Sequence, residues 1–352
     1  MNLSERKRKI LWALVEEYIV TAQPICSKDL QAKYLTECSS ATIRNELSAL
    51  ESMGYLIQPH ISAGRIPTEK AFRLYVDELM ETQPLTESET ALIESKFNDV
   101  FAQGFANIEE IVASVAKVVS EITNYTAVAV RGDFETEKIK SVSVLSLGDN
   151  KALVVLVTDL NVLKDNIIDA PDLAPDAYAA ANKLLNKMFV GKTIKELATK
   201  AGPMELAAKE IVGIRQLYQK ILELVVKVAK SREGDIVTEG TTKIFDYPEY
   251  SSDLDKTRNF LTAIERRQSL AEMFNGSDGL DFSVKIGAES EGLPNGCSCV
   301  SAKISLNEKT LGSAGVIGPV RMDYKKVISV LDQINKLVEK VLGNDETHED
   351  EK

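Results

Sequence analysis

Hydrophobic residues recur at helical spacing in three segments near the start of the chain, and polar turn signals separate these segments. The first helix is expected over residues 4–20. Ser27 is expected to cap a short second helix, and Ser39 or Ser40 to cap a third, which Gly54 ends. Helix, turn, short helix, turn and helix in this order predict a helix-turn-helix.

The third predicted helix has one apolar and one polar face. At 100° per residue, Ile43, Leu47 and Leu50 form a buried stripe. The opposite face carries small residues together with an arginine and an asparagine, side chains suited to guanine and adenine edges. These outward residues are Ala41, Arg44, Asn45 and Ser48. An ordinary amphipathic helix with a solvated polar face is the alternative interpretation.

The segment after this helix predicts a wing. Residues 55–68 hold two short extended stretches around a tip at 60–65, and Thr68 is expected to cap a helix that runs to Met80. A hairpin directly after a recognition helix can meet phosphates or a minor groove. The full set of predicted DNA-binding residues is Ser39, Ser40, Ala41, Thr42, Arg44, Asn45, Ser48, His60, Ser62, Gly64 and Arg65.

The rest of the chain alternates between helical and strand-like patterns. Thr86 and Glu89 form a capping box before a long helical region that reaches about Asn124 and has a possible break at Gly104. Further helices are expected at 175–190, 204–231, after Ser252 and at 323–342. Strands are expected at 126–130, 141–147, 153–158, 162–168, 241–245, 282–286, 299–304 and 314–317, of which 141–168 read as an antiparallel meander. The stripe at Leu217, Ile221, Leu224 and Val228 is more typical of an intrachain core than of a partner face.

Charge is distributed unevenly along the chain. The net charge is -11, yet residues 1–75 contain 10 Lys and Arg against 8 Asp and Glu, whereas the remainder contains 32 against 45. A DNA-facing surface is therefore expected only at the N-terminus. Residues 344–352 are expected to form a disordered acidic tail. Because the sequence shows no signal peptide and no apolar run long enough to span a membrane, we expect a cytoplasmic protein.

Catalytic and metal-binding patterns are weak throughout. Cys26, Cys38, Cys297 and Cys299 lack the spacing of a disulfide framework or a zinc site, and buried or half-buried structural thiols are the better interpretation. Residues 191–193 imitate the end of a phosphate-binding loop, but Thr193 with Glu196 fits a capping box better. We therefore predict no enzyme activity, no metal and no cofactor.

Motifs near both ends of the chain resemble the HrcA heat-inducible transcription repressors of bacteria. The likeness runs through residues 39–47, 50–56, 62–68 and 75–77, and it returns near the C-terminus at 315–319, 321–324 and 327–328. Ala71 and Phe72 depart from the usual Gly-Tyr of the family. The resemblance implies an α+β multidomain fold: a winged helix-turn-helix at 1–80, a GAF-like α/β domain from 81–135 and 236–343, and an inserted α+β dimerisation domain at 136–235.

The resemblance also implies a function. It implies a homodimer that represses heat-shock (chaperone) operons by occupying an inverted-repeat CIRCE operator, with activity supported by the chaperonin GroEL. On DNA the protein would be associated with the bacterial nucleoid. A winged-helix regulator that responds to a small molecule in its GAF-like domain is the alternative, and an interaction scaffold without DNA is disfavoured by the wing and the charge distribution.

Overall fold

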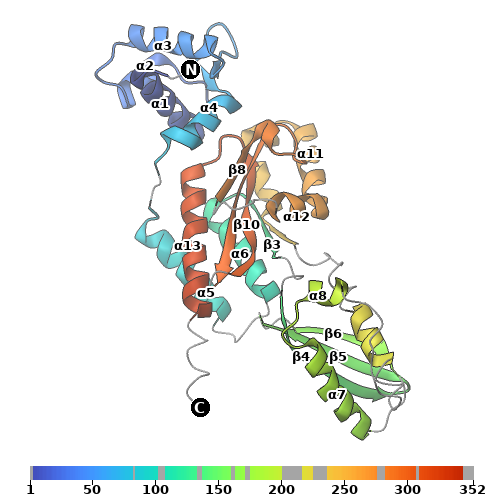
Figure 1. The fold of residues 1–352 in the computed structure, drawn as a ribbon. Helices are drawn as coiled ribbons and strands as arrows, with labels where there is room; N and C mark the ends of the chain where they lie inside the picture. The colour runs from blue at the N-terminus through green and yellow to red at the C-terminus, as the bar shows by residue number, and fades with distance from the viewer. Residues whose placement is uncertain are drawn as a thin grey trace. The chain divides into compact units, whose positions relative to one another are not determined.

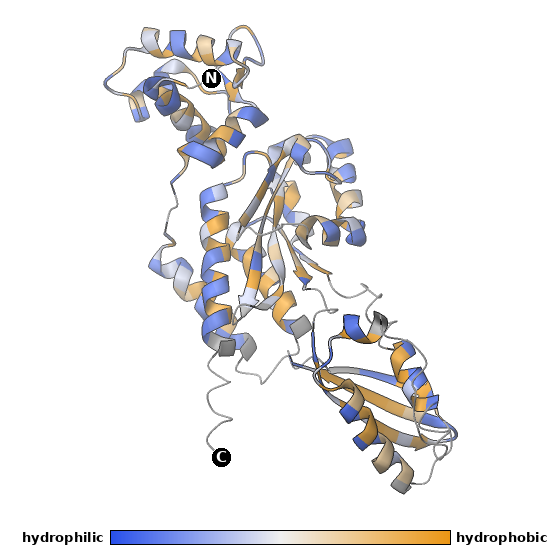
Figure 2. Ribbon diagram, viewed as in Figure 1, coloured by the Kyte–Doolittle hydropathy of each residue, from blue (hydrophilic) through white to orange (hydrophobic). Residues whose placement is uncertain are grey.

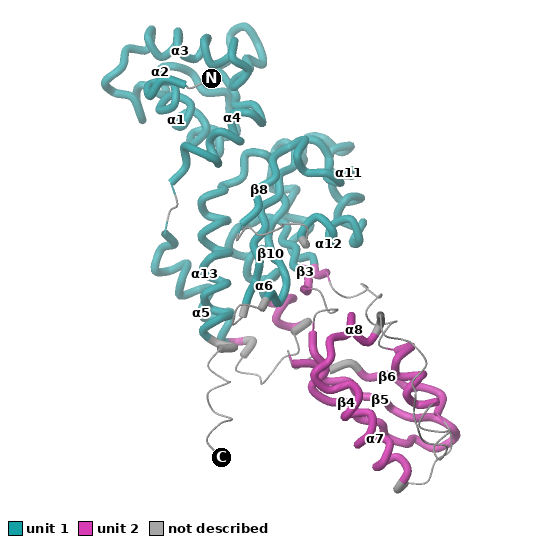
Figure 3. The backbone as a smooth tube through the Cα atoms, viewed as in Figure 1, with its two compact units in different colours: residues 1–98, 115–129, 238–352 teal, residues 99–114, 130–237 magenta. Residues whose placement is uncertain are grey.

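The computed structural model forms two compact units (Figure 3). Unit 1 comprises residues 1–98, 115–129 and 238–352, and unit 2 comprises 99–114 and 130–237. The structure describes residues 3–81, 84–101, 108–132, 137–159, 163–170, 175–199, 216–224, 236–275, 282–306 and 309–343. The predicted acidic tail, the possible break at Gly104 and most of the predicted helix at 204–231 lie outside these residues.

The N-terminal part of unit 1 is a three-helix domain with a small hairpin (Figure 1). Its helices are α1 (Glu5–Thr21), α2 (Ser27–Lys33) and α3 (Ser40–Ser52), and its strands are β1 (Leu56–Ile57) and β2 (Ile66–Pro67). The strands pair antiparallel, with Leu56 opposite Pro67. Helix α4 (Glu69–Leu74) follows and continues as a π-helical turn (Tyr75–Leu79). The predicted helix-turn-helix and wing are confirmed.

Local signals at the helix ends account for these boundaries. The Ser39 hydroxyl accepts a hydrogen bond from the Thr42 amide at 3.1 Å and caps α3, and Gly54, at φ +79°, lies just beyond its end. The prediction that Ser27 caps α2 is wrong by one residue, because Cys26 occupies that position and its amide donates to the Asp29 carboxylate. Ser27 instead lies inside the helix and is buried.

The larger part of unit 1 is a five-stranded sheet flanked by helices, as expected for a GAF-like domain. The strand order is β7-β3-β10-β9-β8. These strands are β3 (Thr126–Arg131), β7 (Ile236–Glu239), β8 (Phe282–Ile286), β9 (Cys297–Leu306) and β10 (Lys309–Pro319). The surrounding helices are α5 (Glu87–Phe101), α6 (Ile108–Thr123), α10 (Pro248–Ser251), α11 (Leu254–Glu265), α12 (Arg267–Asn275) and α13 (Tyr324–Gly343). The boundary between the units crosses α5, α6, β3 and β7, whose residues 99–101, 108–114, 130–131 and 236–237 are counted in unit 2. Hydrophobic residues gather on the sheet and on the side of α13 that faces it (Figure 2).

Alternating residues of β9 contact helices on opposite faces of this sheet. The Tyr324 hydroxyl at the start of α13 bonds the Ser298 hydroxyl, while the Tyr250 hydroxyl of α10 lies 3.0 Å from the Cys297 sulfur on the other face. Burial raises the pKa of the Cys297 thiol to about 11. The prediction of buried or half-buried thiols is confirmed: Cys297 and Cys299 are buried, and Cys26 and Cys38 are half-buried.

The strand predicted at 241–245 is wrong. These residues lie in a 3-10 helix (Thr241–Asp246) directly after β7. Gly240 adopts φ +67° and turns the chain away from the sheet, and Lys243 then donates to the Ser120 carbonyl at 2.6 Å. The β-branched composition of this run is typical of a strand, but the turn at Gly240 determines the outcome.

Unit 2 contains the predicted antiparallel meander. Its strands are β4 (Ile139–Gly148), β5 (Lys151–Thr158) and β6 (Leu163–Asp169), in the order β4-β5-β6. Helix α7 (Pro175–Phe189) packs against β4, and the Thr193–Glu196 capping box begins α8 (Ile194–Thr199). Leu217, Ile221 and Leu224 are buried within the chain, which confirms the intrachain interpretation of that stripe for the residues described. Among the described helices, none is long and apolar enough to cross a bilayer.

Candidate nucleic-acid interface

Helix α3 separates its apolar and polar residues as the sequence predicts. Ile43, Leu47 and Leu50 are buried, and the helix packs against α1 and α2. The four residues of the opposite face are all exposed, namely Ala41, Arg44, Asn45 and Ser48. The structure therefore presents one continuous polar helix face.

Arg44 is the one cation on this face. Its side chain makes no ion pair with any residue that the structure describes. Ser48, one turn later, donates its hydroxyl to the Arg44 carbonyl at 3.1 Å and so lies flat against the helix. The guanidinium and the neighbouring Asn45 amide are free to meet groups outside the chain.

Both carboxylates of α3 are neutralised by neighbouring elements. Lys7 of α1 lies 2.7 Å from Glu46, and Arg65 of the wing lies 2.8 Å from Glu51. An unpaired carboxylate beside a phosphate backbone would oppose binding. With both carboxylates paired, Arg44 is the one charged side chain of the helix that is left without a counter-charge among the described residues. Sequence periodicity did not reveal these ion pairs, because each joins α3 to a different element.

The N-terminal end of α3 is less open than its middle. Ser40 is half-buried, and its hydroxyl lies 2.9 Å from the Ser27 hydroxyl of α2. Ser39 is exposed, but its hydroxyl serves the helix cap and lies 2.9 Å from that of Thr42. Ser40 thus joins the two helices of the motif, whereas Ser39 and Thr42 shape the start of the presented face.

The tip of the wing is held by a glutamine that sequence reasoning missed. The Gln58 side-chain amide donates to the carbonyls of Ile61 and Ala63, at 3.0 and 2.8 Å. His60 and Ser62 are exposed at this tip, and Ile61 is fully exposed. The only sequence signal was a polar residue directly after a strand, which is too common to single out Gln58.

Gly64 and Arg65 lie at the base of the wing. A Cβ on Gly64 would lie 2.3 Å from the Ile25 carbonyl oxygen, so this position is closed to larger residues. The Arg65 amide donates to that same oxygen at 2.8 Å. The Arg65 side chain is 15% exposed and paired with Glu51, so its contact with DNA stays a prediction while its structural role is visible.

Family models match both parts of the chain. Residues 2–80 match a family described as "Winged helix-turn-helix transcription repressor, HrcA DNA-binding", and residues 109–328 match "HrcA protein C terminal domain". The whole chain also resembles a crystal structure titled only as a hypothetical protein, with a TM-score of 0.63 and 22% identity, covering 96% of this chain and 98% of that one. That likeness concerns the fold alone.

Curated relatives extend the match over nearly the full length. The heat-inducible transcription repressor HrcA of Alkaliphilus metalliredigens is 32% identical over 348 residues, which cover 97% of this chain and 98% of the relative. The protein of the same name from Caldanaerobacter subterraneus subsp. tengcongensis is 35% identical over 356 residues, covering 98% of each. With a winged helix whose α3 presents an unpaired arginine, and with these matches from end to end, the chain belongs to the HrcA family of heat-inducible transcription repressors.

Proposed function

We propose that the protein represses transcription by occupying an inverted-repeat operator as a homodimer. Each subunit places the exposed face of α3 in a major groove, and the tip of the wing lies near the flanking backbone. The observation that carries this proposal is the face of Arg44 and Asn45, on a helix whose carboxylates are both paired. Arginine and asparagine are the side chains that read guanine and adenine bidentately.

An exposed apolar row in unit 2 supports dimerisation through that unit. Leu145, Leu153 and Ile167 lie opposite one another across β4, β5 and β6, and they share one face of the sheet. Leu145 is 54% and Ile167 58% exposed, and Leu147 on the same face is 52% exposed. A two-fold dimer needs one self-complementary patch on each subunit, and an apolar row of this kind provides it.

The edge of this sheet at β4 is already occupied. The side-chain amides of Asn182 and Asn186, one turn apart on α7, pair with both the amides and the carbonyls of Val144 and Val142. These contacts replace the hydrogen bonds that a neighbouring strand would make, so β4 cannot readily pair with another chain at these positions. We therefore assign the dimer contact to the apolar face of the sheet.

Operator binding can be tested with the full-length protein and two duplexes of equal length and composition. One duplex carries the inverted repeat, and the other carries the same bases scrambled. We expect the inverted repeat to bind about 10³-fold or more tightly, with both affinities falling as salt rises. Equal affinities at every salt concentration would contradict sequence-specific repression.

The resemblance to the HrcA family supports a more specific proposal for the operator and the regulator. We propose that the operator is of the CIRCE type upstream of chaperone operons, that the chaperonin GroEL supports the active repressor, and that the protein acts in the cytoplasm on the nucleoid. Adding chaperonin to purified protein is then expected to raise the fraction that binds the operator, most clearly after mild heating. A fully active preparation that neither loses activity on heating nor gains from chaperonin would contradict the heat-shock part of the proposal.

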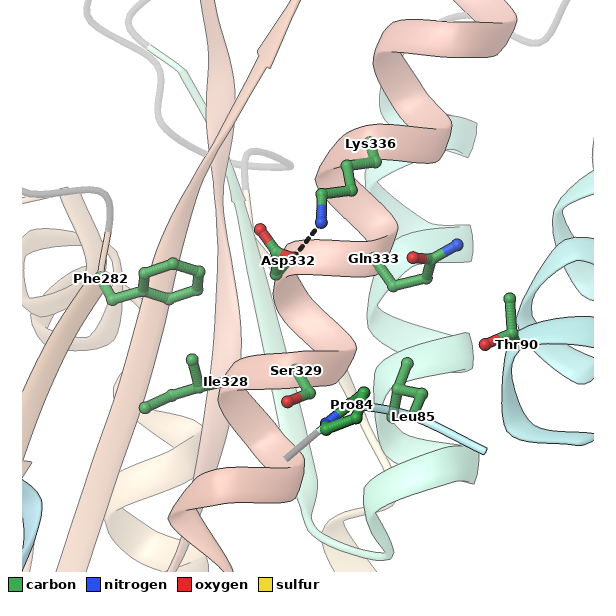
Figure 4. A pocket seen from close by; sticks show the side chains of 9 residues that line it. All are labelled: Pro84, Leu85, Thr90, Phe282, Ile328, Ser329, Asp332, Gln333 and Lys336. Carbon is green, nitrogen blue, oxygen red and sulfur yellow. Dashed lines mark hydrogen bonds and ion pairs between the residues drawn. The ribbon is translucent and has the colours of Figure 1, made fainter. Parts of the chain in front are cut away.

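The alternative of a small-molecule-responsive regulator needs a ligand site, and unit 1 holds an open pocket in which it can be tested. It measures about 570 Å³ and lies between α13 and the segment before α5 (Figure 4). Its volume is in the usual range for ligand pockets. Its lining residues are Pro84, Leu85, Thr90, Phe282, Ile328, Ser329, Asp332, Gln333 and Lys336. Asp332 and Lys336 pair with each other at 2.6 Å, which leaves no uncompensated charge to select a ligand. A metabolite that raises the melting temperature and changes operator affinity would favour the alternative.

A further inference from the structure

Arg321, just before α13, contacts the end of α1, although 302 residues separate the two partners. Its guanidinium donates to the Ile19 carbonyl at 3.0 Å. The last carbonyls of a helix lack intrahelical partners and attract cations, and α1 has no basic residue in its own last turn. Glu249 pairs with the same guanidinium, whose side chain is only 11% exposed. Arg321, a residue of the α/β domain, therefore caps the C-terminal end of a helix in the N-terminal domain.

Lys325, one turn further along, contacts the same N-terminal domain. Its ammonium pairs with Glu16 and lies 5.7 Å from the Trp12 ring centre and 5.8 Å from that of Tyr75. The Tyr75 hydroxyl donates to the same Glu16 carboxylate at 2.5 Å. The lysine side chain is 13% exposed. A carboxylate and two rings thus hold one cation of α13.

The N-terminal domain contacts the α/β domain in return through Arg73 of α4. This arginine pairs with Glu289 and donates to the Val284 carbonyl at 2.7 Å. Between these ionic contacts the rings of Phe72 and Tyr324, both buried, lie 6.3 Å apart. The contact therefore combines a pair of buried rings with cations from each domain that bind acceptors on the other. This geometry defines one orientation of the N-terminal domain on the α/β domain.

We propose that this joint, defined as Arg73, Arg321 and Lys325 with their partners Glu289, Ile19 and Glu16, sets the half-site spacing that the dimer accepts. The inference rests on the proposed operator binding by a homodimer. Each base pair added between half-sites shifts the second site by about 3.4 Å and turns it by about 35°. A freely hinged winged helix could follow that displacement, whereas a docked one cannot. The three cations are thus positioning residues for DNA recognition.

Two adjacent lysines of α13 provide a matched test. Lys325 pairs with the N-terminal domain, whereas Lys326 pairs with Glu89 of α5, 2.9 Å away. Lys325→Met and Lys326→Met each remove one ion pair and keep the apolar stem. The affinity of each full-length variant is measured for operators whose spacer changes in single base pairs and for a single half-site. Thermal unfolding of each variant shows whether it is folded.

We expect the wild type and Lys326→Met to share one sharp spacing optimum. Lys325→Met is expected to bind that optimum about tenfold less tightly, to lose much of the difference between spacings, and to keep its affinity for a single half-site. Glu16→Gln removes the same ion pair but retains an acceptor for the Tyr75 hydroxyl, so it is expected to behave like Lys325→Met. If Lys325→Met does not fold, Glu16→Gln provides the test.

Three results would overturn the inference. The first is a folded Lys325→Met variant whose dependence of affinity on spacing is unchanged. The second is a loss of affinity that is equal at all spacings, and the third is operator binding tighter than that of the wild type. If the wild type binds the inverted repeat specifically but with equal affinity at every spacing, the proposed role of the joint is contradicted. The proposed function would remain supported in that case. A wild type with no preference for the inverted repeat contradicts the proposed function instead.

Discussion

A variant with aspartate at both Leu145 and Ile167 is expected to be a monomer and to bind the operator about 10² to 10⁴-fold less tightly than the wild type. In the proposed dimer these side chains meet their counterparts across an apolar face, where a carboxylate would lose its hydration without gaining a partner. A dimer makes its second half-site contact intramolecular, and a monomer loses that advantage. Molecular mass in solution and operator affinity, measured on the same preparation, check the expectation.

Leu254→Asp is the matched control for this variant. Leu254 begins α11 of unit 1 and is 76% exposed. The substitution therefore places a carboxylate on an exposed leucine outside the apolar row, one charge against the two of the double variant. It is expected to leave both mass and affinity unchanged. If the double variant remains a dimer with full affinity, unit 2 does not dimerise through this face of its sheet.

Arg44→Ala is expected to weaken operator binding by about 1 to 3 kcal/mol while changing affinity for scrambled DNA much less. The reason is geometric, because Arg44 is the exposed, unpaired cation in the middle of the presented face of α3. Competition titrations with both duplexes measure the two losses.

Arg258→Ala controls for the loss of an arginine elsewhere on the surface. Its side chain is 78% exposed on α11 and lies 3.8 Å from Asp255. This variant is expected to bind both duplexes like the wild type. Equal losses on the two duplexes in Arg44→Ala would show instead that Arg44 contacts phosphate and reads no base.

Much of the candidate interface follows from local pattern. The burial of Ile43, Leu47 and Leu50 follows from their spacing, and the ends of α3 follow from Ser39 and Gly54. The meander of unit 2 is equally local, since alternating residues and short turns specify it. Such features are encoded within a few residues of where they appear.

Features that depend on distant partners could not be predicted in this way. The cation of Arg65 was expected to face DNA, but Glu51 of α3 binds its guanidinium. Arg321 belongs to a sequence motif at the far end of the chain and Lys325 follows that motif directly, but nothing in this segment indicates Ile19 or Glu16 as partners. Contacts across hundreds of residues are set by the packing of whole domains, which a single sequence does not display.

The central claim is that α3 of each subunit reads one half of an inverted repeat. Methylation protection of guanines on such an operator, bound by the full-length protein or by Arg44→Ala, tests it most directly, because guanine N7 lies in the major groove. We expect wild-type protein to protect two symmetry-related major-groove segments, and Arg44→Ala to lose protection at one equivalent guanine in each. Protection of a single segment, or an identical pattern with both proteins, would contradict the account.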